Sequence, residues 1–224
     1  MLTSVFLRLT YVGAEWVLWL LLLLSFISVA LIVERCLYFY LHRIDGEDLA
    51  GRLQELLQAG DVRGAWELVE SSDCFECGVV AAGLESLRKG TTACQEAMLS
   101  AKARLKPLLD ARLAVLATIG SNAPFIGLLG TVLGIIKAAH DLTGDAAGNP
   151  NAVMAGVFEA LVATAVGLFV AIPAVIGFNL LQRKVRTTIG QADSLAHLVL
   201  ASVRPDAKPA APAAQRPLVA EGVR

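Results

Sequence analysis

Thr131, Glu159 and Thr164 are the side chains whose types and positions most favour ion chemistry. Thr131 lies in GLLGTVLG and the other two lie in FEALVATAVGLFVAIPAV, segments that are otherwise apolar enough for lipid. A carboxylate inside a membrane span costs roughly 2.5–3.5 kcal/mol on insertion scales, so it usually has a function or a partner. Hydroxyl groups offer hydrogen bonds without fixed charge. Glu159 therefore suits proton transfer or gating, and the two hydroxyls suit a polar pore lining that holds water or receives a charged group from a partner.

Structural interpretations of the same residues stay open. A threonine in a helix can bond the carbonyl of residue i−4, and the glutamate can be a buried carboxylate that bonds a backbone group or a hydroxyl. Five residues separate Glu159 from Thr164, which is about 7.5 Å of rise and about 140° of rotation. Glu159 therefore does not share the threonine's face. It points to a neighbouring helix or subunit, or to the edge of a pore.

Small side chains follow one face of each threonine-bearing span at steps of three and four residues. The candidates for a pore face are Gly127, Gly134, Ala160, Gly167 and Ala171. Such stripes are typical of close helix packing, and they also leave room for a shared axial space if several copies assemble. Because the spans run antiparallel, Thr131 and Thr164 both fall roughly 15–18 Å below the outer surface. In an assembly they would form one polar ring.

Two prolines, Pro124 and Pro173, lie inside these spans. Each removes a backbone N–H and frees a carbonyl, which would wet the path locally. The alternative is that each simply kinks its helix. The sequence favours neither interpretation over the other.

Composition places the chain among membrane proteins. Of its 224 residues, 56% are hydrophobic and 17% are charged, and mean hydropathy is +0.63. Soluble domains carry nearer 25% charge. Residues 12–41, 113–140 and 152–182 are each long enough to cross a bilayer. The net charge of −1 gives no reason to expect a nucleic acid partner.

Lysine and arginine placement predicts the orientation. Residues 42–112 are rich in both, and Arg183, Lys184 and Arg186 follow the third span, whereas residues 141–151 have neither. The positive-inside rule puts the basic segments in the cytoplasm, with the N-terminus and the short loop outside.

The expected fold is all-α, a polytopic membrane protein with three transmembrane helices, of which the second and third extend into a helical cytoplasmic domain. A capping box at Thr92 and Gln95 opens a helix expected to continue past Arg112 into the second span. Four prolines after Arg204 oppose regular structure. The expected segments are an outer N-terminal segment 1–11, transmembrane helix 1 at 12–41, a cytoplasmic helical domain 42–112, transmembrane helix 2 at 113–140, an outer loop 141–151, transmembrane helix 3 at 152–182, a cytoplasmic helix 183–203 and a disordered tail 204–224.

Four cysteines are present, two of them in the CxxC motif formed by Cys74 and Cys77. No second CxxC completes a zinc site, and disulfides are rare in the cytoplasm. Ordinary reduced thiols are therefore the favoured interpretation, with metal or redox chemistry as the alternative. We expect no metal and no cofactor.

Two motifs resemble a known family. TIGSNAPFIGLLGTVLGI, residues 118–135, and EALVATAVGLFVAIPAV, residues 159–175, resemble the MotA/TolQ/ExbB proton-channel family. Three spans with a large cytoplasmic segment after the first resemble its ExbB/TolQ branch, and the Glu34-Arg35 pair that ends span one also fits.

The resemblance implies a motor subunit in the bacterial inner membrane. It implies a homopentamer around two copies of a single-span ExbD/TolR-type partner, whose aspartate carries protons, with a TonB/TolA-type protein as a further partner. Thr131 and Thr164 would border the proton path, and Glu159 matches the family's motif glutamate. The transported ion is H⁺ rather than Na⁺ on this resemblance alone. The work powered would be TonB-dependent uptake, Tol function or gliding.

Two other functions are possible. One is a membrane scaffold for an envelope complex that conducts no ions. The other is a solute transporter, which would show internal repeats or broken helices around a substrate site. Three spans without a repeat argue against it. We do not expect an enzyme.

Overall fold

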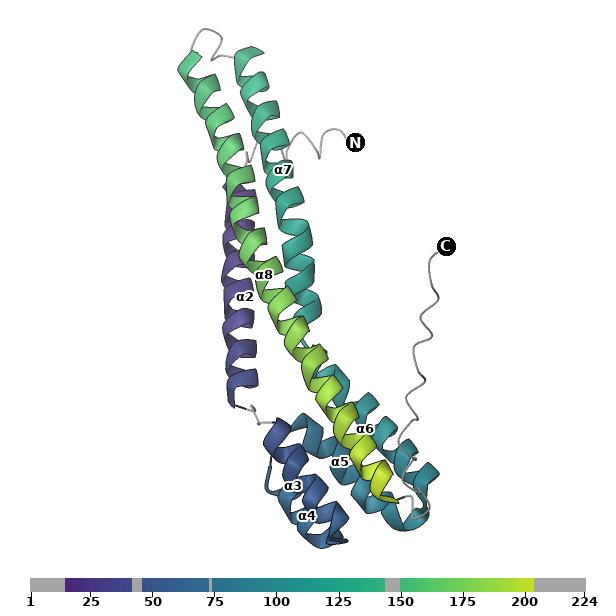
Figure 1. Cartoon of the computed structure of the whole chain (residues 1–224). Coiled ribbons are helices and arrows are strands. Elements are labelled where there is room, and N and C mark those ends of the chain that lie inside the picture. The colour runs from purple at the N-terminus through teal and green to yellow at the C-terminus, as the bar shows by residue number, and fades with distance from the viewer. Residues whose placement is uncertain (1–14, 42–45, 73, 144–149, 204–224) are drawn as a thin grey trace, which may run out of the picture. The chain divides into compact units, whose positions relative to one another are not determined.

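The computed structural model describes residues 15–41, 46–72, 74–143 and 150–203. Within those ranges all regular structure is helical and no strand is present, which confirms the all-α expectation (Figure 1). Three helices are long and apolar enough to cross a membrane. The chain divides into two compact units. One comprises Met1–Ile44 and Ala103–Gly190, and the other comprises Asp45–Lys102 and Gln191–Arg224.

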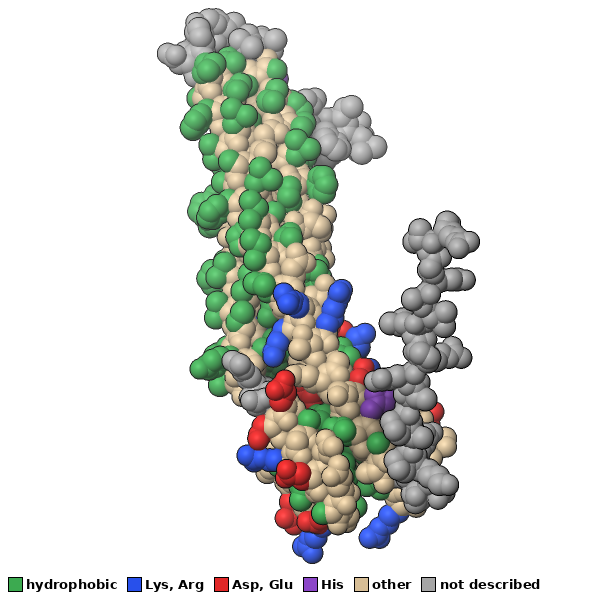
Figure 2. Space-filling model, in the orientation of Figure 1, with side chains coloured by type: hydrophobic (Ala, Val, Ile, Leu, Met, Phe, Trp, Pro, Cys, Tyr) green, Lys and Arg blue, Asp and Glu red, His purple; other side chains and the backbone are tan. Residues whose placement is uncertain are grey.

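The first unit contains three long helices that lie side by side, α2 (Glu15–Leu41), α7 (Leu113–Thr143) and α8 (Pro150–Val203) up to Gly190, together with α6 (Thr91–Asp110) from Ala103 onward. Hydrophobic side chains cover most of the face of this unit seen in Figure 2. Large exposed ones, among them Trp19, Phe125 and Phe169, are 68–74% exposed in the isolated chain. Such surface is typical of contact with lipid or with another subunit.

The third span and the helix expected at 183–203 are one continuous helix, α8, of 54 residues. No proline interrupts it after Pro173, and a glycine within a helix costs only about 1 kcal/mol. The helix therefore passes through Gly190 without a break.

A break between α6 (Thr91–Asp110) and α7 corrects the expectation of one helix running into span two. Pro107 lies inside α6 and does not end it. The chain turns instead at Arg112, whose φ of 67° lies in the left-handed region, a conformation that is uncommon for residues other than glycine.

Two side chains of α2 contact the chain at this break. The carboxylate of Glu34 forms an ion pair with Arg112, and Arg35 Nη1 donates to the carbonyl of Leu108 at 3.1 Å. The last four carbonyls of a helix have no intrahelical donor, and cations are stabilising at that end of the dipole. Arg35, only 6% exposed, therefore caps the C-terminus of α6.

The second unit contains α3 (Gly46–Gln58), α4 (Val62–Glu70), α5 (Phe75–Ser86), the short 3₁₀ helix η1 (Leu87–Lys89) and the parts of α6 and α8 assigned to it. Lys102 of α6 pairs with Asp193 of α8 at 2.5 Å. The buried core of the second unit includes Leu49, Leu53, Ala65, Val69, Val80, Leu84, Cys94, Met98, Leu195 and Val199.

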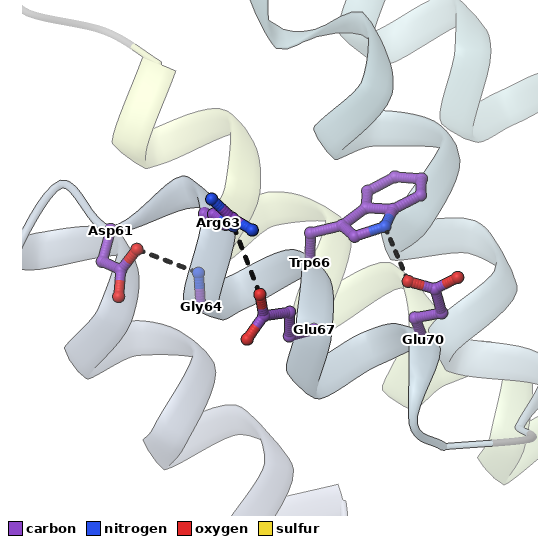
Figure 3. A network of polar contacts seen from close by, with 6 residues as sticks. All are labelled: Asp61, Arg63, Gly64, Trp66, Glu67 and Glu70. Atoms are coloured by element: carbon purple, nitrogen blue, oxygen red, sulfur yellow. Dashed lines mark hydrogen bonds and ion pairs between the residues drawn. The ribbon is translucent and has the colours of Figure 1, made fainter.

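Glycine and aspartate residues account for the turns of this unit. Gly60 and Gly90 adopt φ of 75° and 99°, which glycine does at little cost. Asp61 caps α4 by accepting a hydrogen bond from the Gly64 N–H at 2.9 Å, as Figure 3 shows. In the same helix, Arg63 forms an ion pair with Glu67, and the Trp66 indole N–H donates a hydrogen bond to Glu70.

The cysteine pair departs from the expectation of reduced thiols. Cys74 and Cys77 form a disulfide at the start of α5. Their Cα atoms lie 5.1 Å apart, within the range that a disulfide requires, because the first turn of a helix brings residues i and i+3 together. Cys36 and Cys94 are free thiols, exposed and buried respectively.

Candidate functional site

Glycine sets the spacing between α7 and α8 at the level of the candidate residues. A Cβ added to Gly127 would lie 2.8 Å from the carbonyl oxygen of Ala163 and 3.2 Å from the Cα of Gly167. One added to Gly167 would lie 2.8 Å from the carbonyl oxygen of Ala123. No side chain fits in either place, so the two backbones are in direct contact.

The other predicted small residues are also buried within the chain. A Cβ on Gly134 would lie 2.8 Å from the Cβ of Ala160, which pairs these two positions across the helices. Ala160 and Ala171 are 1% and 4% exposed. The stripes therefore serve close packing inside one protomer, the first of the two interpretations. That they also border an axial space in an assembly stays a prediction.

Thr164 makes the polar contact between the two helices at this level. Its hydroxyl donates to the carbonyl oxygen of Gly127 at 3.3 Å. The contact depends on the glycine, because a side chain at position 127 would meet the Cα of Thr164 at 3.1 Å. Thr164 is only partly buried, and its oxygen retains lone pairs that can accept a hydrogen bond.

Thr131 keeps its hydrogen bond within α7, donating to the carbonyl of Leu128 at 2.6 Å. Two helix contacts bracket it: Gly130 against Ala163, and Gly134 against Ala160. In this antiparallel register Thr131 lies opposite residue 162, two residues from Thr164, which is about 3 Å along the axis. The structure thus places both hydroxyls at nearly one level, each on a partly buried residue.

Glu159 lies five residues before Thr164 on α8, about 7.5 Å along the axis, and has an unsatisfied acceptor. Its Oε1 is buried without a hydrogen-bond partner among the described residues. Most buried polar atoms in proteins are paired, so an orphaned carboxylate oxygen requires an explanation. The indole N–H of Trp16 in α2 is also buried without a hydrogen-bond partner among the described residues.

The two prolines occupy the interiors of these helices, Pro124 in α7 and Pro173 in α8. A proline provides no N–H to the carbonyl four residues earlier. The carbonyls of Gly120 and Phe169 therefore lack their usual helical donor. Both helices continue through the prolines.

A polar cluster on α7, formed by Thr118, Ser121 and Asn122, was not predicted from the sequence. All three are exposed. Their hydrogen bonds stay on α7: Thr118 donates to Ala114, and Ser121 and Asn122 both donate to the carbonyl of Thr118. Three polar side chains within five residues of an apolar span were the available signal. Such a surface is poorly suited to lipid and favours contact with water or protein.

The described residues provide no cluster of three or more His, Cys, Asp or Glu side chains that could hold a metal ion. The chemistry available at the site is hydrogen bonding and proton exchange, from two hydroxyls and one carboxyl group. Of these groups, only the Thr164 hydroxyl bonds across the close α7–α8 contact.

Comparison with known proteins gives consistent matches. A model of the MotA/TolQ/ExbB proton channel family matches residues 73–194, more than half of the chain, including all three candidate polar residues. The biopolymer transport protein ExbB of Neisseria meningitidis serogroup B is 33% identical over 192 residues, covering 80% of this chain and 86% of that protein.

Shorter and more similar matches lie in two other proteins. The putative biopolymer transport protein ExbB-like 2 of Helicobacter pylori is 48% identical over 97 residues, 43% of this chain and 64% of that protein. ExbB of Aquifex aeolicus is 49% identical over 85 residues, 38% of this chain and 57% of that protein. With its three apolar helices and these matches, the chain belongs to the MotA/TolQ/ExbB proton channel family, in the ExbB/TolQ branch.

Proposed function

We propose that this chain is a subunit of a proton-driven motor in the bacterial inner membrane. It would act with a single-span ExbD/TolR-type partner and use the proton motive force to energise work on the cell envelope. Family membership and the name of the relatives, biopolymer transport proteins, support this role. The single observation that carries it furthest is the pair of partly buried threonines, Thr131 and Thr164, whose hydroxyls lie at nearly one level of α7 and α8.

The hydroxyls suit the handling of a partner's carboxyl group. Each donates its own hydrogen to a backbone carbonyl, of Leu128 and Gly127 respectively. Each oxygen can then accept a hydrogen bond from a protonated carboxylic acid or from water. Because the hydroxyls are uncharged, they would not trap the carboxylate after it loses its proton. Five copies of the chain would set five such pairs in one ring around the partner helices.

Glu159 would serve the same path as a proton-accepting group or as a contact between subunits. Its buried Oε1 lacks a donor among the described residues. A water molecule in the pathway or a neighbouring subunit would provide one. The alternative, a carboxyl group that is protonated and purely structural, stays open for this residue.

The proposed orientation follows from basic residues. Arg183, Lys184 and Arg186 lie on α8 beyond the third span, and the second unit carries further lysine and arginine. Loops rich in these residues stay in the cytoplasm. The second unit and the C-terminus would therefore be cytoplasmic, and the N-terminus periplasmic.

The test is energised work in cells that depend on this chain and its partner. Thr131→Val, Thr164→Val and Glu159→Ala are each expected to lower partner-dependent uptake or envelope function at least about tenfold, because each removes a group of the path. Thr187→Val is the matched control, since Thr187 is exposed and bonds the Arg183 carbonyl of its own helix. It should behave as wild type.

Assembly is measured on the same variants by the mass of the purified complex. We expect five copies of this chain with two of the partner, unchanged in all variants. A non-conducting scaffold predicts a different result, with all three variants fully active because packing alone would matter. That outcome would exclude the motor.

A further inference from the structure

The CxxC motif lies at the N-terminus of α5, with Cys74 as its N-cap residue. The Cys74 sulfur accepts a hydrogen bond from the Cys77 N–H at 2.9 Å and is bonded to the Cys77 sulfur. The N-terminal N–H groups of a helix, and its dipole, stabilise negative charge. A thiolate released at Cys74 would therefore be stabilised where it forms.

The two sulfur-bearing residues differ in access. Cys77 is 2% exposed, and Cys74 is only partly buried. Disulfide exchange requires a thiolate to approach one sulfur from outside while the other leaves. Because Cys74 is more exposed than Cys77, we take its sulfur as the one open to attack and Cys77 as the internal partner.

This bond contributes little as a structural crosslink. Disulfide stabilisation grows with the length of the closed loop, and only two residues separate Cys74 from Cys77. Phe75 and Glu76, which lie between them, already belong to the first turn of α5. The buried contacts of α5, such as Val80 and Leu84, do not depend on the bond.

We propose that Cys74 and Cys77 form a redox-active dithiol–disulfide pair that exchanges electrons with a cellular thiol reductant, a protein dithiol or glutathione. The inference goes beyond motor function and rests on the proposed cytoplasmic location of the second unit. In that compartment disulfides are usually transient and take part in catalysis or redox sensing. Two closely spaced cysteines at a helix N-terminus, one of them partly exposed, fit such a role.

Reduction proceeds in two exchange steps. A thiolate of the reductant attacks the Cys74 sulfur, forming a mixed disulfide, and the Cys77 thiolate leaves and takes a proton. A second thiolate of the reductant then attacks the reductant's sulfur that is bonded to Cys74 in the mixed disulfide. The Cys74 thiolate leaves and takes a proton. The reductant has become a disulfide, and its two electrons reside on the two cysteine thiols.

The first experiment titrates the full-length protein in detergent with mixtures of reduced and oxidised dithiothreitol. Free thiols are then trapped in acid and labelled with a maleimide-linked polymer that shifts the mass. We expect a reversible gain of two labels per chain on reduction. Cys74→Ser and Cys77→Ser should each abolish the two-label step. Absence of the disulfide at every ratio would overturn the proposal, and so would a disulfide that native-state reduction leaves intact.

The other two cysteines provide matched controls. Cys36→Ser removes an exposed thiol, and Cys94→Ser removes a buried one that donates to the carbonyl of Gly83 at 3.3 Å. Burial raises the pKa of the Cys94 thiol, so it should stay protonated and label slowly. Both variants should keep the two-label transition.

The asymmetry of the pair has its own test with oxidised glutathione. In Cys77→Ser the remaining Cys74 should form a mixed disulfide at least about tenfold faster than Cys77 does in Cys74→Ser, because access controls exchange. Equal rates would overturn the assignment of Cys74 as the attacked sulfur.

A measurement in cells separates this proposal from the motor. Acid trapping of growing bacteria should find the pair reduced, and a thiol oxidant should oxidise it reversibly within minutes. A pair that stays oxidised throughout growth would overturn the proposal and indicate an oxidising compartment for the second unit. Failure of the threonine variants to affect function would leave this result unchanged, so the two proposals fail separately.

Discussion

At the scale of single residues, the candidate site depends on the missing side chain of a glycine as much as on the threonine hydroxyls. Thr164 reaches the Gly127 carbonyl only because position 127 has no side chain. Thr131 bonds the carbonyl of Leu128 and takes no part in that contact. Two similar threonines thus have different bonding, one between helices and one within its own helix.

A methyl group at position 127 tests this arrangement. Gly127→Ala would meet the Ala163 carbonyl oxygen at 2.8 Å, and overpacking of this kind costs typically about 1–3 kcal/mol. We expect a lower midpoint of thermal unfolding in detergent, together with loss of energised work. Gly190→Ala is the control, since nothing lies within 4 Å of its added Cβ. It should be neutral or slightly stabilising, and equal effects of the two substitutions would refute the tight contact.

Residue-scale features were predictable from the sequence where they depend on near neighbours. The cap by Asp61 on Gly64 and the positive φ of Gly60 and Gly90 follow from the chemistry of a few adjacent residues. The bonding of Thr164 was not predictable, because its acceptor lies 37 residues away. The exposed patch around Asn122 was overlooked because hydropathy averaged over a span conceals three polar side chains.

At the scale of elements, the break between α6 and α7 could not be predicted from the periodicity of the sequence. Helical patterning continues through Ala111 and Arg112, and only contacts with α2 identify the turn. Arg35 and its acceptor Leu108 are 73 residues apart. The three spans themselves were predicted from length and hydropathy alone, because a membrane helix needs no partner to be recognised.

Removing the Arg35 side chain tests how the break is held. Arg35→Ala leaves the Leu108 carbonyl without its charged donor, and hydrogen bonds to charged groups contribute about 1.5–3 kcal/mol. Arg112→Ala removes an ion pair with Glu34 in which both side chains are about half-exposed, and such pairs contribute about 0–1 kcal/mol.

Thermal unfolding of the purified variants should therefore rank Arg35→Ala well below Arg112→Ala. The opposite order, or no difference between them, would contradict the assignment of Arg35 as the cap of α6. Both variants should still insert into the membrane, because the apolar spans are unchanged.

At the scale of the whole molecule, we propose that the packed α7–α8 contact of one chain works as part of an assembly of several chains. One chain buries small residues of the α7–α8 contact, such as Ala160 and Ala171, and leaves large apolar side chains such as Trp19, Phe125 and Phe169 exposed. Lipid covers part of that surface, and in our proposal neighbouring subunits cover the rest. We expect the hydroxyls and Glu159 to come together around the partner only when several chains assemble.

Proton flux into liposomes containing the purified complex tests the central claim most directly, with an imposed membrane potential as the driving force. Thr164→Val keeps the shape of the side chain and removes the hydroxyl, and Thr187→Val is the control. We predict that Thr164→Val lowers the flux at least about tenfold while the complex keeps its mass, and that Thr187→Val conducts as wild type. Undiminished flux through an intact Thr164→Val complex would contradict the account.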